Sequence, residues 1–252
     1  MNATPEQRIT CEVCIESVEG ALAAERGGAD RLELCGELAL GGISPSVGLL
    51  RQVVTATSLP VMVMVRPRAG GFCYSNAEIE TMAAEISFLQ NESVAGAVFG
   101  VLDQDGRVNV EACKRLVDLA RPMSVTFHRA FDWTRDASEA TEDLIDIGVD
   151  RVLSSGQQPT AEQGSGLLST IAKQAGNALT IMPGSGVNEA NVRKLIETVG
   201  TTEIHFSAGV PAEPEESFCR GNVPMMSVEN YLVRKTSEDR VRTISQAAKQ
   251  TS

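Results

Sequence analysis

Short apolar runs alternate with amphipathic stretches along almost the whole chain. The apolar runs are rich in branched residues, as buried strands are, and the stretches between them carry the spacing of surface helices. We predict strands at residues 9–15, 30–35, 60–65, 95–101, 123–128, 150–154, 178–182 and 203–206. We predict helices at residues 17–28, 45–57, 76–90, 109–121, 137–147, 164–176, 188–198 and 237–249. This alternation is typical of βα units around a parallel sheet.

Eight such units predict a (β/α)8 TIM barrel, and the 252 residues of the chain match the size of one such domain. We place the barrel core at about 9–206, followed by a long loop at 209–236 and a carboxyl-terminal helix at 237–249. The loop is too long for a routine connection, and we interpret it as a lid, an interface arm or a partly mobile flap. Segments that leave the strands are rich in charge, glycine and proline, and barrels bind ligands on that face.

The charge and hydropathy of the chain argue against several classes of binding partner. The net charge of −11, without a basic stripe, argues against nucleic acid and anionic membranes. No apolar run reaches the length of a spanning helix, and the amino terminus lacks the apolar core of a signal peptide. We therefore expect a cytoplasmic protein whose six cysteines are mostly reduced.

A carboxylate and a thiol recur in the same order on the first two predicted strands. Glu12 and Cys14 share one strand face, and Glu33 and Cys35 share a face of the next strand. Inward-facing thiols on adjacent strands would lie close enough to bind Cu(I), which soft sulfur ligands suit. The alternative is that both cysteines are small buried apolar residues. Cys11 should point to the opposite face from Cys14, which excludes a thioredoxin-like pair.

Two arginines and both histidines of the chain fall at predicted strand ends. Arg66 and Arg68 could clamp a carboxylate or phosphate, or pair with Glu12 or Glu33 as a structural network. His128 and His205 are candidates for general acid or base catalysis, or for structural roles. All five lysines lie in predicted helices or in the long loop, which argues against a Schiff-base aldolase.

Further candidates line the segments that leave the later strands. The sequence MPGSGV at 182–187 would present backbone N–H groups ahead of a helix, which favours a phosphate, although glycine-rich turns also form for geometric reasons. The candidate substrate-binding residues are Arg68, Asp132, Ser155, Gly184, Gly186 and Ser207.

Motifs across residues 10–208 resemble those of the CutC family of copper homeostasis proteins. The matching segments include EVCIESVE at 12–19, GGADRLELC at 27–35, VRPRAGGF at 65–72, TFHRAFD at 126–132, IMPGSGV at 181–187 and IHFSA at 204–208. The resemblance implies a (β/α)8 barrel and Cu(I) bound through Cys14 and Cys35. It brings no accepted enzymatic reaction, and Cys11 and Cys73 depart from the expected pattern.

Three hypotheses follow. The first is a cytoplasmic Cu(I)-binding protein that uses Cys14 and Cys35. The second is a barrel enzyme for a small anionic, phosphorylated or carboxylated, metabolite, with Glu12, Glu33, Arg66, His128 and His205 converging on one rim. The third is a homo-oligomeric scaffold in which the rim residues are structural and segment 209–236 is an interface arm.

Overall fold

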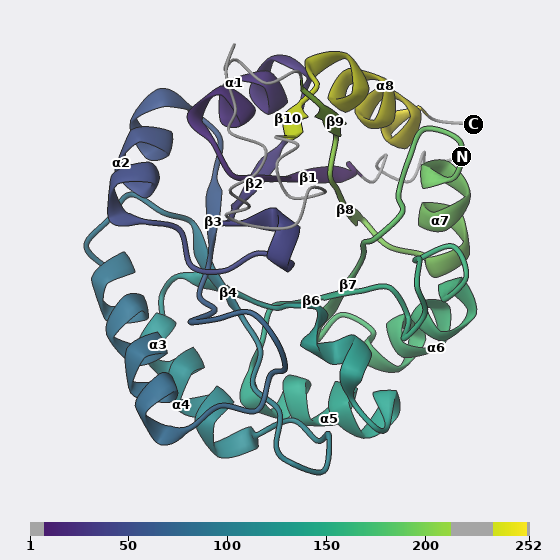
Figure 1. Cartoon of the computed structure of the whole chain (residues 1–252). Coiled ribbons are helices and arrows are strands. Elements are labelled where there is room, and N and C mark those ends of the chain that lie inside the picture. Colours follow the sequence, from purple (N-terminus) through teal and green to yellow (C-terminus); the bar gives the residue numbers. More distant parts are fainter. Residues whose placement is uncertain (1–7, 213–233, 251–252) are drawn as a thin grey trace, which may run out of the picture.

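The computed structural model describes residues 8–212 and 234–250, which form a ring of helices around a parallel barrel (Figure 1). The strands are β1 Thr10–Ile15, β2 Arg31–Leu34, β3 Val61–Met64, β4 Gly96–Phe99, β5 Ser124–Phe127, β6 Arg151–Ser154, β7 Thr180–Pro183 and β8 Glu203–Phe206. The helices are α1 Val18–Arg26, α2 Val47–Ala56, α3 Asn76–Leu89, α4 Val110–Ala120, α5 Ala137–Ile147, α6 Ser165–Ala175, α7 Val192–Val199 and α8 Glu238–Lys249.

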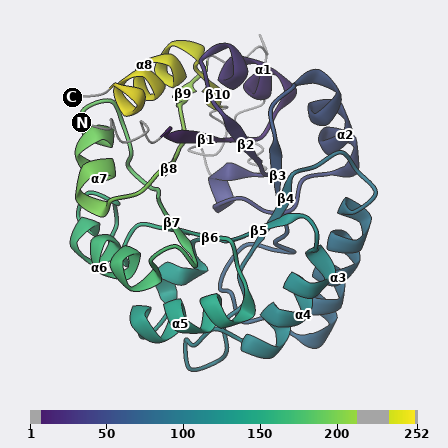
Figure 2. The same cartoon turned by 180° about the vertical axis from the view of Figure 1, so that it is seen from behind.

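The eight strands follow the order β7-β6-β5-β4-β3-β2-β1-β8. The two ends of this order, β7 and β8, lie next to each other, so the ring is nearly closed, as the view from behind also shows (Figure 2). The predicted (β/α)8 barrel is confirmed. Short 3-10 helices, η1 Leu38–Leu40 and η2 Arg129–Trp133, lie in the segments that leave β2 and β5.

The two faces of each strand carry different chemistry. Along β3, Val61 and Val63 pack under the helices in the main apolar core, whereas Met62 and Met64 form a separate cluster inside the barrel. Most branched side chains gather outside the strands, whereas the inner faces carry methionines, thiols and charged residues together with Val98. This interior differs from the branched apolar filling that is usual for barrels.

Most helix ends match their sequence signals. The side chain of Ser17 accepts a hydrogen bond from the Gly20 N–H group at the start of α1, and Gly148 ends α5 at φ 83°, a left-handed conformation that suits glycine. The predicted start of a helix at Asn188 was wrong. The side chain of Asn188 accepts from the Ala190 N–H group and forms a turn, so α7 begins only at Val192.

The predicted loop at 209–236 has ordered ends. Strand β9, Gly209–Pro211, pairs antiparallel with β10, Arg234–Thr236, directly before α8. Residues 213–233, the rest of the predicted lid or interface arm, lie outside the described residues. Among the described helices, none is both long enough and apolar enough to cross a membrane.

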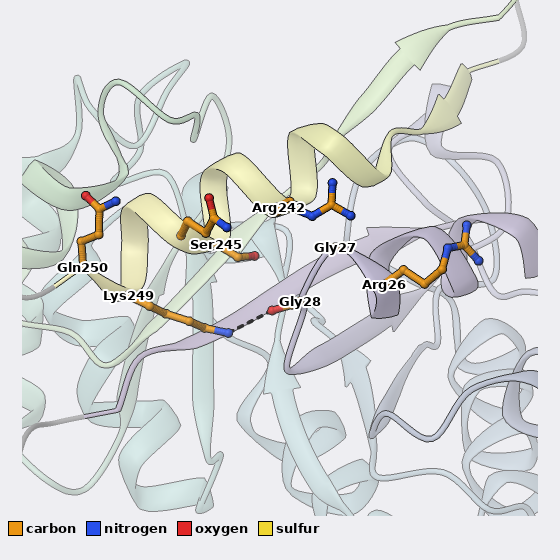
Figure 3. A pocket seen from close by; sticks show the side chains of 8 residues that line it. Arg26, Gly27, Gly28, Arg242, Ser245, Lys249 and Gln250 are labelled. Carbon is orange, nitrogen blue, oxygen red and sulfur yellow. Dashed lines mark hydrogen bonds between the residues drawn. The ribbon is translucent and has the colours of Figure 1, made fainter.

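Helix α8 packs against α1 and completes the outer ring. Figure 3 shows Lys249 of α8 reaching the Gly28 carbonyl, with an N–O distance of 2.9 Å. A shallow hollow lies between these helices, but its cations are already paired, since Arg26 binds Glu238 at 2.7 Å. Gly27 allows the close approach, because a Cβ atom there would lie 2.6 Å from the Cβ of Val241.

We therefore predict that Gly27→Ala lowers the free energy of unfolding by about 1–3 kcal/mol, the usual cost of overpacking. Gly166→Ala in α6 is the matched control, because a Cβ atom there meets nothing within 4 Å. The control should be neutral or stabilise by up to about 1 kcal/mol. Urea unfolding of both variants measures the difference, and equal stabilities would contradict the α1–α8 contact described here.

Candidate functional site

A buried ion network spans one side of the barrel interior. Arg31, at the start of β2, donates hydrogen bonds to both Glu12 of β1 and Glu203 of β8. The register of the sheet sets this contact, since Glu12 and Arg31 are partners in the β1–β2 pair. Arg151 of β6 reaches Glu203 from the other side at 3.1 Å. The buried Glu12 and the partly buried Glu203 are thus neutralised by two guanidinium groups.

Glu12 also fixes the imidazole of His205. The Nδ1 atom of His205 lies 2.9 Å from Oε1 of Glu12, which is fully buried. Burial alone would raise the pKa of Glu12, but the Arg31 charge and the bond to His205 overcome it and lower that pKa to about 2. Glu12 is therefore an ionised acceptor, so the Nδ1–H group of His205 donates to it and the Nε2 atom faces the other way.

The Nε2 atom of His205 faces a thiol and a second carboxyl group. Ligand atoms of Cys14, Glu33 and His205 all lie within 4.8 Å of one another, and the three side chains are buried. The Oε1 atom of Glu33 has no protein hydrogen-bond partner. We call these residues the Cys14–Glu33–His205 triad. It combines sulfur, nitrogen and oxygen donors in the arrangement of a metal site.

Cys35 lies beside the triad. Its Sγ atom is 3.6 Å from Oε2 of Glu33. Burial and the neighbouring Glu33 carboxyl raise the pKa of Cys35 well above its ordinary value, and burial also raises the pKa of Glu33. Cys11, in contrast, packs in the outer core on the other face of β1, as predicted. The five described cysteines are free, and Cys219 lies outside the described residues.

Arg66 forms part of a second, separate group. Its terminal nitrogens donate to the carbonyls of Leu40, Gly42 and Gly70 at 2.8–3.1 Å. The guanidinium thus ties the segment after β2 to the segment after β3. The structural alternative, an ion pair with Glu12 or Glu33, was wrong, because backbone carbonyls occupy these donors instead.

His128 lies near Arg66, across the end of β4. Its Nδ1 atom accepts a hydrogen bond from the Ala130 N–H group at 3.1 Å and so caps η2. The Phe72 ring lies 5.0 Å from the His128 ring and 5.2 Å from the Arg66 guanidinium carbon, measured between centroids and from Cζ. The expected single rim cluster is therefore two groups, one around His205 and one around His128.

Asp132 and Ser155 bind each other. Oδ2 of Asp132 accepts from the Ser155 hydroxyl at 2.9 Å, and Oδ1 accepts from the Ser154 hydroxyl at 2.6 Å. Arg129 also pairs with Asp132, at 2.9 Å. The predicted substrate-binding pair thus holds the segments after β5 and β6 together, and a substrate role for it stays a prediction.

The other predicted substrate ligands are dispersed. Arg68 forms an ion pair with Glu78 in its own loop. Gly184 packs close to His205, because a Cβ atom there would lie 3.4 Å from the histidine Cβ. Gly186 adopts φ 73°, and the exposed Ser207 accepts from the Gly209 N–H group. A phosphate site at Gly184 and Gly186 stays a prediction.

Residues that the sequence reasoning missed supply the network under the triad. Arg31 shares its strand face with Glu33, Glu203 shares one with His205, and Arg151 faces them from β6. The period-two alternation therefore placed these residues on the inner faces of their strands. They were missed because they begin their strands, whereas the candidate residues were sought near the strand ends. The combination of Cys14 with His205 was also missed.

Comparison with known proteins decides the family. The family model described as the CutC family matches residues 9–210 of this chain. The chain belongs to the CutC family. The CutC match covers the whole ring of barrel strands, including all members of the triad.

Curated relatives match this chain over almost its full length. The human protein named copper homeostasis protein cutC homolog is 42% identical over 241 residues, covering 94% of this chain and 88% of the relative. A family protein CutC of Bacteroides fragilis is 41% identical over 244 residues, covering 93% of this chain and 96% of the relative. The CutC crystal structure from Streptococcus agalactiae is 27% identical with a TM-score of 0.74, covering 79% of this chain and 98% of that one.

Removal of the Arg31 guanidinium should destabilise the folded protein. We predict that Arg31→Met lowers the free energy of unfolding by about 3–5 kcal/mol, because it leaves buried Glu12 without its strongest partner. Arg115→Met is the control, because the Arg115–Glu80 pair is exposed and should contribute little to stability. Chemical denaturation measures the free energy of unfolding of both variants. Similar losses of stability would show that the buried network contributes no more than an exposed ion pair.

His128 predicts a pH dependence of stability. Burial and the Arg66 charge lower its pKa from 6.5 to about 3, so the folded protein keeps the ring neutral where the unfolded chain takes up a proton. The contribution of His128 to stability should therefore fall as the pH drops below 6.5, by about 2 kcal/mol at pH 5. The contribution of His205 has the opposite sign, because its pKa is raised and the unfolded chain releases its proton as the pH rises through 6.5.

The His128→Asn variant isolates this effect, because asparagine can still accept from the Ala130 N–H group but does not titrate. Urea unfolding at several pH values between 7 and 5 should show that the wild type loses stability relative to the variant as the pH falls. Identical slopes would refute a buried neutral His128.

Proposed function

We propose that this CutC protein binds Cu(I) in the barrel interior, through Cys14 and His205, with Cys35 as the second thiol and Glu33 beside the ion. The mutual proximity of the Cys14 thiol, the His205 imidazole and the Glu33 carboxyl carries the proposal. The names of the human and mouse relatives, copper homeostasis protein cutC homologs, point to the same metal.

The donor set suits a soft cation. Thiolate and imidazole ligands favour Cu(I), and metal-bound histidines generally donate their other ring N–H group to a carboxylate. Glu12 accepts that hydrogen bond here, so it orients Nε2 of His205 toward the thiol. The unpartnered Oε1 atom of Glu33 supplies a further acceptor for a positive ion. The chemistry of these donors supports a metal at this place.

The surroundings favour a carrier or storage role for copper as cargo. All members of the triad are buried, which shields a bound ion from water and oxidants. Free thiols throughout the described chain fit a reducing compartment, and we therefore propose that the protein acts in the cytoplasm.

Anaerobic titration of the reduced protein with Cu(I), against a coloured Cu(I) chelator, tests the proposal. Glu12→Gln should weaken binding by about 10–100-fold, because it removes the group that orients His205. The double variant Cys14→Ser with Cys35→Ser should lose more affinity than that, since it removes ligands directly. A parallel titration with Zn²⁺ shows whether the site selects the softer ion.

Two cysteine variants serve as controls. Cys11→Ser changes a thiol on the same strand but on its outer face, and Cys73→Ser changes an exposed thiol. Both should bind Cu(I) as the wild type does. Unchanged affinity in the Cys14 and Cys35 double variant, or equal loss in the Cys73 control, would refute the proposed site.

A further inference from the structure

Unpaired buried donors gather at a second place in the barrel. Among the described residues, five buried side-chain polar atoms have no protein hydrogen-bond partner, and two of them are Nε of Arg66 and Nε2 of His128. A third is the hydroxyl of Tyr74, which lies beside the Arg66 side chain and belongs to the same cluster. Buried polar groups are normally hydrogen-bonded, so this concentration indicates a missing acceptor.

The hydrogen-bond pattern defines both atoms as donors. Nδ1 of His128 accepts from the Ala130 N–H group, so it carries no proton. Because the buried ring is neutral near neutral pH, its single proton is on Nε2. Nε of Arg66 is also a donor, and its guanidinium is positively charged. The pair can bind an anion or a carbonyl oxygen, but it repels a metal ion.

Local packing brings the two donors to the same rim position. Gly100 follows β4, and a Cβ atom there would lie 2.7 Å from Nδ1 of His128. Glycine therefore lets the histidine of β5 extend across β4 toward Arg66 after β3. The Phe72 ring contacts both side chains, within about 5 Å of each. All three side chains thus belong to one cluster that is separate from the copper site.

We propose that Arg66 and His128 form a binding site for a small oxyanion, namely the carboxylate or phosphate group of a metabolite. The guanidinium supplies charge, and the two N–H groups supply direction. Three carbonyl contacts hold Arg66 in place before any ligand arrives, and the bond from Ala130 holds the His128 ring. Such preorganisation lowers the entropic cost of binding.

Phe72 covers this site. Its ring lies over His128 and meets the Trp133 ring edge-on at 5.3 Å between centroids. Phe72 is only partly buried, and Trp133 is 64% exposed, so the covering ring borders solvent.

Nuclear magnetic resonance of the histidine rings tests the site directly in the full-length protein. The chain has two histidines, so ¹⁵N labelling of histidine gives two ring systems. Inorganic phosphate or malonate should shift the Nε2 signal of His128 and leave that of His205 unchanged. The two probes separate a phosphate preference from a carboxylate preference, and either supports an oxyanion site. Sodium chloride at matched ionic strength is the control.

Two substitutions of one residue separate binding from structure. His128→Asn keeps an acceptor for the Ala130 N–H group but removes the donor at Nε2, whereas His128→Gln keeps a donor near Nε2 and loses that acceptor. Calorimetric titration should show at least a tenfold loss of affinity for the favoured probe in the asparagine variant and a smaller loss in the glutamine variant. The Cys14 and Cys35 double variant should bind the anion normally, which distinguishes this site from the copper site.

Three results would overturn the proposal. One is a His128 signal that does not respond to either probe. Another is a response that chloride reproduces, and the third is equal anion affinity in the wild type and the asparagine variant. In those cases the unpaired donors are satisfied by solvent, and the cluster is structural.

Discussion

The contact between Arg31 and Glu12 determines the chemistry of the barrel interior. It keeps Glu12 ionised without exposure to water, and an ionised Glu12 is what holds the Nδ1–H group of His205. With that nitrogen fixed, the other one faces Cys14 and Glu33. The sheet register places Arg31 opposite Glu12, so the orientation of the His205 ring follows from the pairing of β1 with β2.

In this barrel, apolar packing and charged side chains lie on opposite faces of the strands. Branched residues outside the strands bury apolar area against the helices, and this packing supports the fold. The inner positions are thereby free to hold charge on the side of β1, β2 and β8, while Arg66 and His128 occupy the rim at β3 and β5. One site is rich in acceptors and thiols and the other in donors, so they favour ligands of opposite charge.

Sequence patterns predicted the fold well, because each strand and most helices carry local signals such as the cap at Ser17 and the glycine at 148. The candidate site was predicted by residue type but not by grouping. The alternation placed Glu12, Cys14 and Glu33 inside, yet no local pattern shows which rim residues meet across the ring. His128 and His205 look alike in sequence, but burial and the Arg66 charge lower the pKa of His128, whereas the Glu33 carboxyl and the contacts with Cys14 and Glu12 raise the pKa of His205.

The three carbonyl bonds of Arg66 also have a mechanical meaning. They join the segment at Leu40 and Gly42 to the segment at Gly70, two stretches that are separate in sequence and leave neighbouring strands. A single side chain thus fixes the spacing between the segment that follows β2 and the loop that carries Phe72. Removal of the Arg66 guanidinium would leave three backbone carbonyls without these donors, so the side chain is a brace between two loops as well as a charge.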